Sequence, residues 1–252
     1  MLNNAKTLQG YKLASLDGEI GTVKEFYFDD HHWTIRYLVV DTGDWLSSKL
    51  VLISPHALRS VNKEKETIEI NLTKKQIEDC PSPETDKPVS RQFEEQYHGY
   101  FGWPMYWNIP NSLGNSHHVT YDPETQILND HGSKPFDLHL RSTRDVGAHH
   151  IQATDGEIGH VDDFIINTKT WAIRYLIIDT HNWLPGKKVL ISPDWIDHVS
   201  WVEEKVYIDR TQKSIHQCPE FTTMSLITRD FEQELHQHFK RPESWTTQSH
   251  IN

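Results

Sequence analysis

Cysteine is scarce in this chain of 252 residues, which contains only Cys80 and Cys218. Two thiols cannot build the disulfide framework that stabilises small secreted domains, so we expect the fold to rest on packing alone. The two cysteines lie 138 residues apart, and each precedes a proline. We interpret them as small buried side chains at equivalent places of two similar units. A disulfide between them is the alternative, which a reducing compartment would disfavour.

Long apolar segments are missing as well. No run of apolar residues approaches the roughly 18 residues that a membrane-spanning helix needs. The first ten residues, MLNNAKTLQG, lack the apolar core of a signal peptide. We therefore expect a soluble protein that works in the cytoplasm and has no membrane span.

Positive charge is in the minority, with 25 lysines and arginines against 36 aspartates and glutamates, a formal net charge of −11 at pH 7. A net acidic surface repels phosphate backbones, so we do not expect a nucleic-acid partner. Histidine is plentiful, at 17 residues, and its protonation would reduce the negative charge on mild acidification.

The short motifs that mark common catalytic sites are absent from the sequence. There is no G-x-S-x-G elbow, no Walker phosphate loop, no G-x-G-x-x-G fingerprint and no H-E-x-x-H. Histidine pairs such as His31–His32 and His149–His150 are not combined with cysteine at the spacing of a zinc site. We expect no catalytic residue, no cofactor and no metal site. A metal ion held by histidines distant in sequence stays open as an alternative.

What the sequence does contain is a repeat. Residues Asp17–Pro55 align with Asp155–Pro193 at an offset of 138 without a gap, and 22 of the 39 positions are identical. Weaker matches continue on both sides, including Glu94 with Glu232 and His98 with His236. A repeat of this quality predicts two copies of one structural unit. The predicted bounds are 2–104 and 140–242 for the units, with barrels at about 8–80 and 146–218, 105–139 for an unmatched connector and 243–252 for a tail.

Within each unit the pattern favours short strands and tight turns. Asp17–Gly18 is a dipeptide that accepts the backbone of a tight hairpin turn, and Asp155–Gly156 repeats it. Thr73, with Gln76 three residues later, predicts the capped start of a helix. Strands are expected at about 21–28, 35–40, 49–53 and 66–71, and further helices at 90–99 and 228–240. Five or six short strands with little helix predict a small antiparallel β-barrel.

Three motifs in this order resemble the PRC-barrel family, which is named for the cytoplasmic domain of the photosynthetic reaction centre H subunit and includes a domain of a ribosome maturation factor. They are the D-G-E-I-G turn (Asp17–Gly21), the strand and loop Arg36–Leu46, and the strand end Lys49–Pro55. The stretch Gly99–Gly114 also resembles an aromatic connector of bacterial members. The resemblance implies a mainly β protein, with two small antiparallel six-stranded barrels in tandem, short flanking helices and a pseudo-twofold arrangement. It also implies action by binding or assembly, without shared catalytic residues.

Two sets of aromatic and charged residues are candidate binding sites. Buried Trp, Tyr and Arg side chains dominate the energetics of protein interfaces. The first set, which we call the doubled set because its residues occur in both repeats, is a candidate interface with a partner or between the barrels. A role in the barrel core is the alternative. The doubled set comprises Trp33, Arg36, Tyr37, Trp45, Trp171, Arg174, Tyr175 and Trp183. The connector set is a candidate groove, with a strap across the two barrels as the alternative; it comprises Tyr100, Trp103, Tyr106 and Trp107.

Two functions follow from these observations. The first is a non-enzymatic interaction or assembly module that docks on a protein partner, with further self-association left open. The alternative is a small-molecule or metal-binding protein, or an enzyme, with a site between the barrels. Binding to RNA or the ribosome is a third option by analogy of fold alone, and the acidic charge disfavours it.

Overall fold

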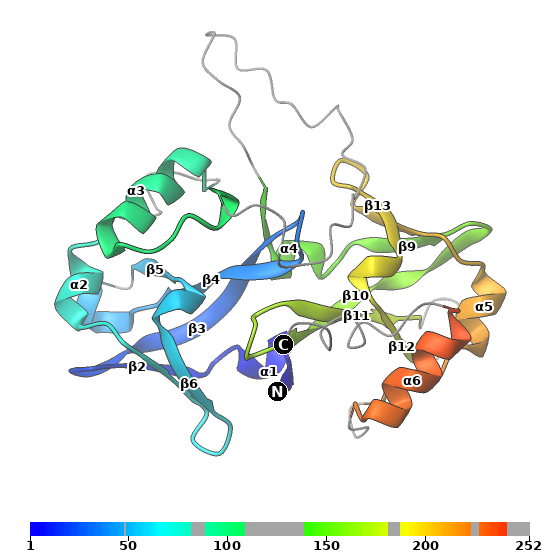
Figure 1. Cartoon of the computed structure of the whole chain (residues 1–252), viewed down its shortest axis with the longest axis horizontal. Helices are drawn as coiled ribbons and strands as arrows, with labels where there is room; N and C mark the ends of the chain where they lie inside the picture. The colour runs from blue at the N-terminus through cyan, green and yellow to red at the C-terminus, as the bar shows by residue number, and fades with distance from the viewer. Residues whose placement is uncertain (48, 82–88, 109–138, 181–186, 223–226, 241–252) are drawn as a thin grey trace, which may run out of the picture.

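The chain folds into two seven-stranded sheets, one built mainly by each repeat (Figure 1). A computed structural model describes residues 1–47, 49–81, 89–108, 139–180, 187–222 and 227–240. We call the part made by the first repeat unit 1 and the part made by the second unit 2. In Figure 1 unit 1 occupies the left half and unit 2 the right half. The duplicated, mainly β architecture that the repeat predicts is therefore confirmed.

The two units have the same strand order. In unit 1 the order across the sheet is β5-β4-β3-β2-β7-β6, and in unit 2 it is β12-β11-β10-β9-β14-β13. The strands of unit 1 are β2 (Lys12–Ser15), β3 (Gly18–Asp29), β4 (Thr34–Asp41), β5 (Leu50–Ile53), β6 (Leu58–Asn62) and β7 (Thr67–Ile70). Those of unit 2 are β9 (His150–Ala153), β10 (Gly156–Asn167), β11 (Ile173–Asp179), β12 (Lys188–Ile191), β13 (Ile196–Ser200) and β14 (Lys205–Ile208).

The expectation of closed, wholly antiparallel barrels was wrong in two respects. One strand pair in each unit, β2 with β7 and β9 with β14, is parallel. In addition, the hydrogen-bonded order among the described residues is an open path that ends at β5 and β6. Both departures have one cause. The chain keeps its direction as it passes from β5 through the 3-10 turn η2 (Pro55–Ala57) into β6. The two edge strands are therefore consecutive in the chain, and the described residues show no ladder between them.

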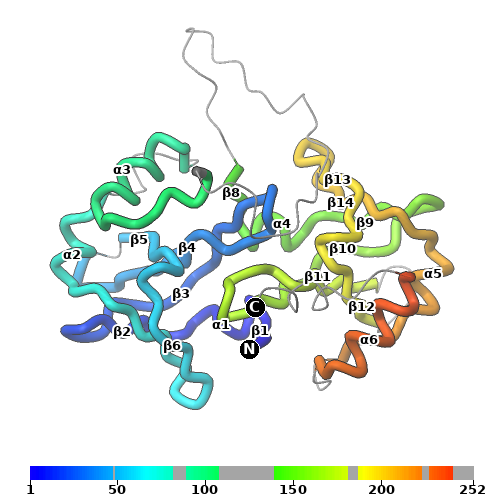
Figure 2. Tube along the Cα trace, in the orientation of Figure 1, coloured from blue at the N-terminus to red at the C-terminus, as the bar shows by residue number. Residues whose placement is uncertain are grey.

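Each sheet takes its seventh strand from the other unit. The N-terminal strand β1 (Leu2–Asn4) pairs with β10 of unit 2, and β8 (Leu140–Ser142) pairs with β3 of unit 1 (Figure 2). Short helices α1 (Ala5–Leu8) and α4 (Thr143–Val146) follow these two strands. Strands of three residues are too short to show a hydrophobic periodicity, so the sequence pattern does not predict this exchange of strands.

The two donated strands are anchored differently. On β8, Arg141 Nε lies 2.9 Å from Asp30 Oδ2 of unit 1. At the equivalent place on β1, Asn3 Nδ2 donates to Thr168 Oγ1 of unit 2 at 3.2 Å. The same contact is therefore an ion pair on one side of the molecule and a neutral hydrogen bond on the other.

The helix caps that the sequence predicts are present. Helix α2 (Lys74–Glu78) starts with a complete capping box between Thr73 and Gln76. Thr211 is the N-cap residue of α5 (Gln212–Gln217). The longer helices are α3 (Arg91–Phe101) and α6 (Arg229–His238). The carboxylate of Asp17, in the Asp-Gly turn, also accepts a hydrogen bond from the Lys74 amide at 2.8 Å. This turn therefore fixes the start of α2 as well as reversing the chain.

One hydrophobic core runs through both units. Its central contact is between Phe28 of β3 and Phe164 of β10, whose ring centroids lie 5.9 Å apart. A second, smaller cluster lies between helix α3 and the other face of β4 and β5, and it includes Val39, Leu52, Phe93 and Tyr97. Helix α3 is thus attached to unit 1 mainly by this cluster, and its last residue, Phe101, also packs against the main core.

Deleting residues 1–4 should loosen unit 2, although these residues begin the first repeat. The ladder with β10 would be lost, and a few hydrogen bonds of about 1 kcal/mol each predict a cost of roughly 1–3 kcal/mol. Amide hydrogen exchange should then accelerate at Ile166, which pairs with Asn3, and at Thr168, whose amide donates to the Met1 carbonyl.

The matched control is Arg141→Pro in β8, which should move the faster exchange to Phe28, which pairs with Arg141, and to Asp30, whose amide donates to the His139 carbonyl. Acceleration confined to unit 1 after the deletion would contradict the exchange of strands.

Candidate functional site

Trp33 and Trp171 of the doubled candidate set lie where the two units meet. Each ends a β-hairpin turn, is buried, and has a left-handed backbone, with φ of 47° and 59°. The Ile35 amide donates to the Trp171 carbonyl and the Ile173 amide to the Trp33 carbonyl, both at 2.8 Å. A left-handed backbone costs a residue with a side chain about 1 kcal/mol. These reciprocal hydrogen bonds hold the two hairpin tips together despite that cost.

The two candidate arginines are engaged within their own units. Arg36 Nη2 lies 3.0 Å from Asp29 Oδ2, and Arg174 Nη2 lies 3.4 Å from Glu232 Oε1. Burial disfavours the charged form of Asp29, but the hydrogen bond from His32 and the charge of Arg36 outweigh it and lower the pKa of Asp29. Both arginines therefore serve intramolecular ion pairs.

The remaining tryptophan of the doubled set in unit 1 is half-buried at one end of that unit. Trp45 follows β4 in the 3-10 turn η1 (Gly43–Leu46), and its indole N–H donates to the Ile20 carbonyl. The Lys74 ammonium lies 5.2 Å from the centre of its ring. Its counterpart Trp183 lies outside the described residues.

The candidate tyrosines are the centre of a polar cluster that occurs twice. Tyr37 is fully buried, and its hydroxyl lies 3.0 Å from Glu94 Oε1 and 2.9 Å from His98 Nε2. The equivalent distances from the Tyr175 hydroxyl are 2.8 Å to Glu232 Oε1 and 3.3 Å to His236 Nε2. Burial and the neighbouring carboxylate raise the pKa of both tyrosines. Each tyrosine thus fastens the long helix of its unit to the sheet.

Sequence reasoning did not select the glutamate and histidine of this cluster. Both residues were visible in the repeat, because Glu94 and His98 match Glu232 and His236 at the same offset as the tyrosines. Their spacing of four also places them on one face of a helix. What the sequence could not show is that this face meets the tyrosine of β4.

In unit 1 the cluster is extended by three further residues, of which Arg91 has an equivalent, Arg229, in unit 2. Tyr106, in η4 (Tyr106–Asn108), donates to Glu94 Oε1 at 2.6 Å. His139 Nε2, at the start of unit 2, lies 3.0 Å from Glu94 Oε2 and 2.7 Å from the Tyr106 hydroxyl. Arg91 Nη1 lies 3.2 Å from Glu94 Oε2. Glu94 therefore joins unit 1, the connector and the first residue before β8.

The described connector aromatics pack on unit 1. Trp103 stacks on Phe101 with ring centroids 4.3 Å apart, and Trp107 lies 5.3 Å from the His98 ring. Tyr100 is the most exposed of the candidate connector residues, and its hydroxyl donates to the Gln76 carbonyl at 3.1 Å. These side chains pack on or beside helix α3.

In unit 2 a different tryptophan packs against the equivalent helix. Trp195, in η6 (Pro193–Trp195), lies 4.7 Å from Phe239 and 5.1 Å from His236 by ring centroids. Its equivalent in unit 1 is Ala57, and the Phe101 ring there is covered by Trp103 of the connector instead. Trp103, whose equivalent position in unit 2 is Arg241, thus occupies in unit 1 the place that Trp195 fills in unit 2.

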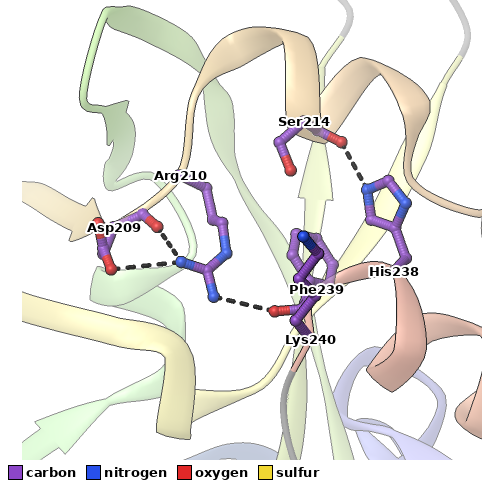
Figure 3. Close-up of a pocket in the computed structure, with 6 residues that line it drawn as sticks. All are labelled: Asp209, Arg210, Ser214, His238, Phe239 and Lys240. Carbon is purple, nitrogen blue, oxygen red and sulfur yellow. Dashed lines mark hydrogen bonds and ion pairs between the residues drawn. The ribbon is translucent and has the colours of Figure 1, made fainter.

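A shallow, open depression lies beside the end of α6 (Figure 3). Arg210 Nη2 donates to the Phe239 carbonyl at 3.1 Å, and His238 Nε2 lies 2.8 Å from the Ser214 carbonyl. The equivalents of Arg210 and His238 in unit 1 are Leu72 and Tyr100. Because its arginine and histidine are already bonded to the backbone, the depression offers little polar chemistry to a ligand.

Both cysteines of the chain are free thiols. Burial raises the pKa of Cys80 to about 11 and that of Cys218 to about 12, so both thiols stay protonated near neutrality. No group of three or more His, Cys, Asp or Glu side chains converges among the residues that the structure covers. Over the same residues, no helix is long and apolar enough to cross a bilayer.

Replacing Tyr37 by phenylalanine should destabilise the protein more than the same change at Tyr175. The first change leaves Glu94 and His98 without the hydroxyl at a site closed to water, which costs about 1–3 kcal/mol. The side chain of Glu232 is 14% exposed, so water can replace the hydroxyl there. Urea unfolding at pH 7 measures the difference, and equal losses would refute this account.

Comparison with known proteins places the sequence motifs in a family. The model of the PRC-barrel domain matches residues 3–77 and 151–215, which together are more than half of the chain. None of the curated proteins in the comparison matches it. The matched segments include Tyr37 and Tyr175 but end before α3 and α6, so the glutamates and histidines of the two clusters lie outside the family domain. The chain belongs to the PRC-barrel domain family, with one domain in each unit.

Proposed function

We propose that this chain is a non-enzymatic interaction or assembly module that docks on a protein partner in the cytoplasm. The observation that carries the proposal is that four of the aromatic candidate residues are buried inside the molecule. Trp33, Trp171, Tyr37 and Tyr175 are buried in contacts within the molecule. A partner must therefore bind elsewhere, on side chains that remain exposed.

An apolar surface of this kind lies at the end of unit 1 around Lys74. Leu16 is 58% exposed in the turn between β2 and β3, and its amide donates to the Leu72 carbonyl at 2.9 Å. Asp17, the next residue, bonds to the Lys74 amide, and the Lys74 ammonium reaches toward half-buried Trp45. We call Leu16, Trp45 and Lys74 the end patch.

Two of the three residues of the end patch, Leu16 and Lys74, are specific to unit 1. The equivalents of Leu16 and Lys74 in unit 2 are Thr154 and Gln212. A feature required to build the barrel would be expected in both copies, whereas an exposed leucine in only one copy suits recognition. Aromatic and apolar side chains beside a single cation favour a protein surface that is apolar with an acidic rim.

The alternative, a small molecule or metal ion held between the units, gains no support from the described part of the junction. Phe28 and Phe164 pack against each other there, and the hairpin tips are joined by backbone hydrogen bonds. The net charge of −11 likewise gives no support to nucleic acid as the partner.

Leu16→Asp should abolish partner binding without unfolding the protein, because the side chain is exposed and a carboxylate would be buried unpaired in the complex. The measurement is quantitative mass spectrometry of proteins captured from a native extract by the tagged full chain. The matched control is Thr154→Asp, the same change at the equivalent turn of unit 2. Proteins captured equally by both variants and the parent protein would show that the end patch is not the docking site.

A further inference from the structure

The hydrogen bonds of His98 fix where one of its protons lies. His98 Nδ1 is 3.0 Å from the Pro104 carbonyl oxygen, which can only accept a hydrogen bond. Nδ1 must therefore carry hydrogen. If the imidazole is neutral, Nε2 then carries none and acts as an acceptor.

The next contact creates a shortage of protons. His98 Nε2 lies 2.9 Å from the Tyr37 hydroxyl, which also lies 3.0 Å from Glu94 Oε1. Tyrosine has one hydroxyl proton. A neutral His98 and an ionised Glu94 would each need this proton for a hydrogen bond with the Tyr37 hydroxyl. In one of the two contacts, two lone pairs would then face each other with no hydrogen between them, at a site closed to water.

One additional proton satisfies both contacts. If it lies on His98 Nε2, the imidazolium donates to Tyr37, and Tyr37 donates to Glu94. If it lies on Glu94, the carboxyl donates to Tyr37, and Tyr37 donates to Nε2. The two arrangements differ only by a shift of protons along the same hydrogen bonds, so the proton belongs to the three residues as a unit.

We propose that His98, Tyr37 and Glu94 form a relay that holds this additional proton in the folded protein and latches helix α3 to unit 1. The relay is independent of the end patch and of the proposed partner. Helix α3 packs mainly through its own small cluster and reaches the main core at its last residue, Phe101, so it can loosen while both sheets stay intact.

The surroundings of the relay pull the proton in opposite directions. Burial lowers the pKa of the His98 imidazole, although the Pro104 carbonyl and Glu94 act to raise it. Arg91 and His139 contact the Glu94 side chain, and Tyr106 donates to one of its oxygens. Arg36 of β4 and His56 of η2 act to lower the pKa of His98 as well. The proton is therefore retained by the chain of hydrogen bonds rather than by one favourable environment.

The sign of the pH dependence follows from proton counts. In the unfolded chain at pH 7 to 8, a glutamate is ionised and a histidine mostly neutral, with ordinary pKa values of about 4.3 and 6.5. The folded relay then binds more protons than the unfolded chain, so its contribution to stability decreases as the pH rises. Below about pH 6 the unfolded histidine is protonated as well, and the dependence disappears.

Nuclear magnetic resonance of the labelled full chain at pH 7 tests the proton directly. The ring nitrogens of His98 report which of them carry hydrogen, and the side-chain carboxyl carbon of Glu94 reports its ionisation. We expect either a doubly protonated His98 or a protonated Glu94. A His98 with hydrogen only on Nδ1 beside an ionised Glu94 would overturn the proposal.

Unfolding equilibria between pH 7 and 8.5 test the consequence. The ratio of folded to unfolded protein should fall by up to about tenfold per pH unit from this relay, and Tyr37→Phe should remove that part of the slope. Tyr175→Phe is the matched control and should remove less, because the contact of Tyr175 with His236 is longer, at 3.3 Å. An unchanged slope in Tyr37→Phe would overturn the proposal. If Tyr37→Phe does not fold, the resonance measurement on the parent protein decides alone.

Discussion

The reciprocal exchange of strands is the constraint on which the rest of this structure depends. Each sheet contains a strand from the other unit, and the two hairpin tips are tied by backbone hydrogen bonds from Ile35 and Ile173. Separating the units would expose two strand edges and the contact between Phe28 and Phe164. Because the core runs through both units, the duplicated chain behaves as one folding unit and not as two independent domains. It has the organisation of a homodimer whose subunits have been fused.

Duplication also explains which residues are shared and which are not. The Asp-Gly turns, the tyrosines at the sheet and the glutamate and histidine of the long helices occur in both units, because each unit must attach its helix in the same way. The departures concentrate in unit 1. Its cluster gains Tyr106 and His139, its helix is covered by Trp103, and Leu16 stands at its end. Residues of the connector and of the junction between the units thus make unit 1 different from unit 2.

Much of the local structure could be predicted because it is decided by neighbours in the sequence. The capping box of Thr73 and Gln76, the Asp-Gly turns and the strand around Tyr37 depend on backbone conformations that a few adjacent residues specify. The parallel pair of β2 and β7 could not be predicted, since it depends on the chain keeping its direction past Pro55. The role of Glu94 was equally hidden, because its partners Tyr37, Tyr106 and His139 are 57, 12 and 45 residues away along the chain.

By itself, the amino-acid sequence determined the duplication, the strand-rich units and the turns and caps within them, all of which follow from short-range patterns repeated at one offset. Only the tertiary structure decided that the conspicuous tryptophans join the units, that two three-residue strands cross between them, and that a buried tyrosine is shared by a glutamate and a histidine. These features arise from contacts between residues distant in the chain. Burial of an aromatic or charged side chain depends on the residues that pack against it in the folded protein. Its neighbours in the sequence do not specify which residues those are.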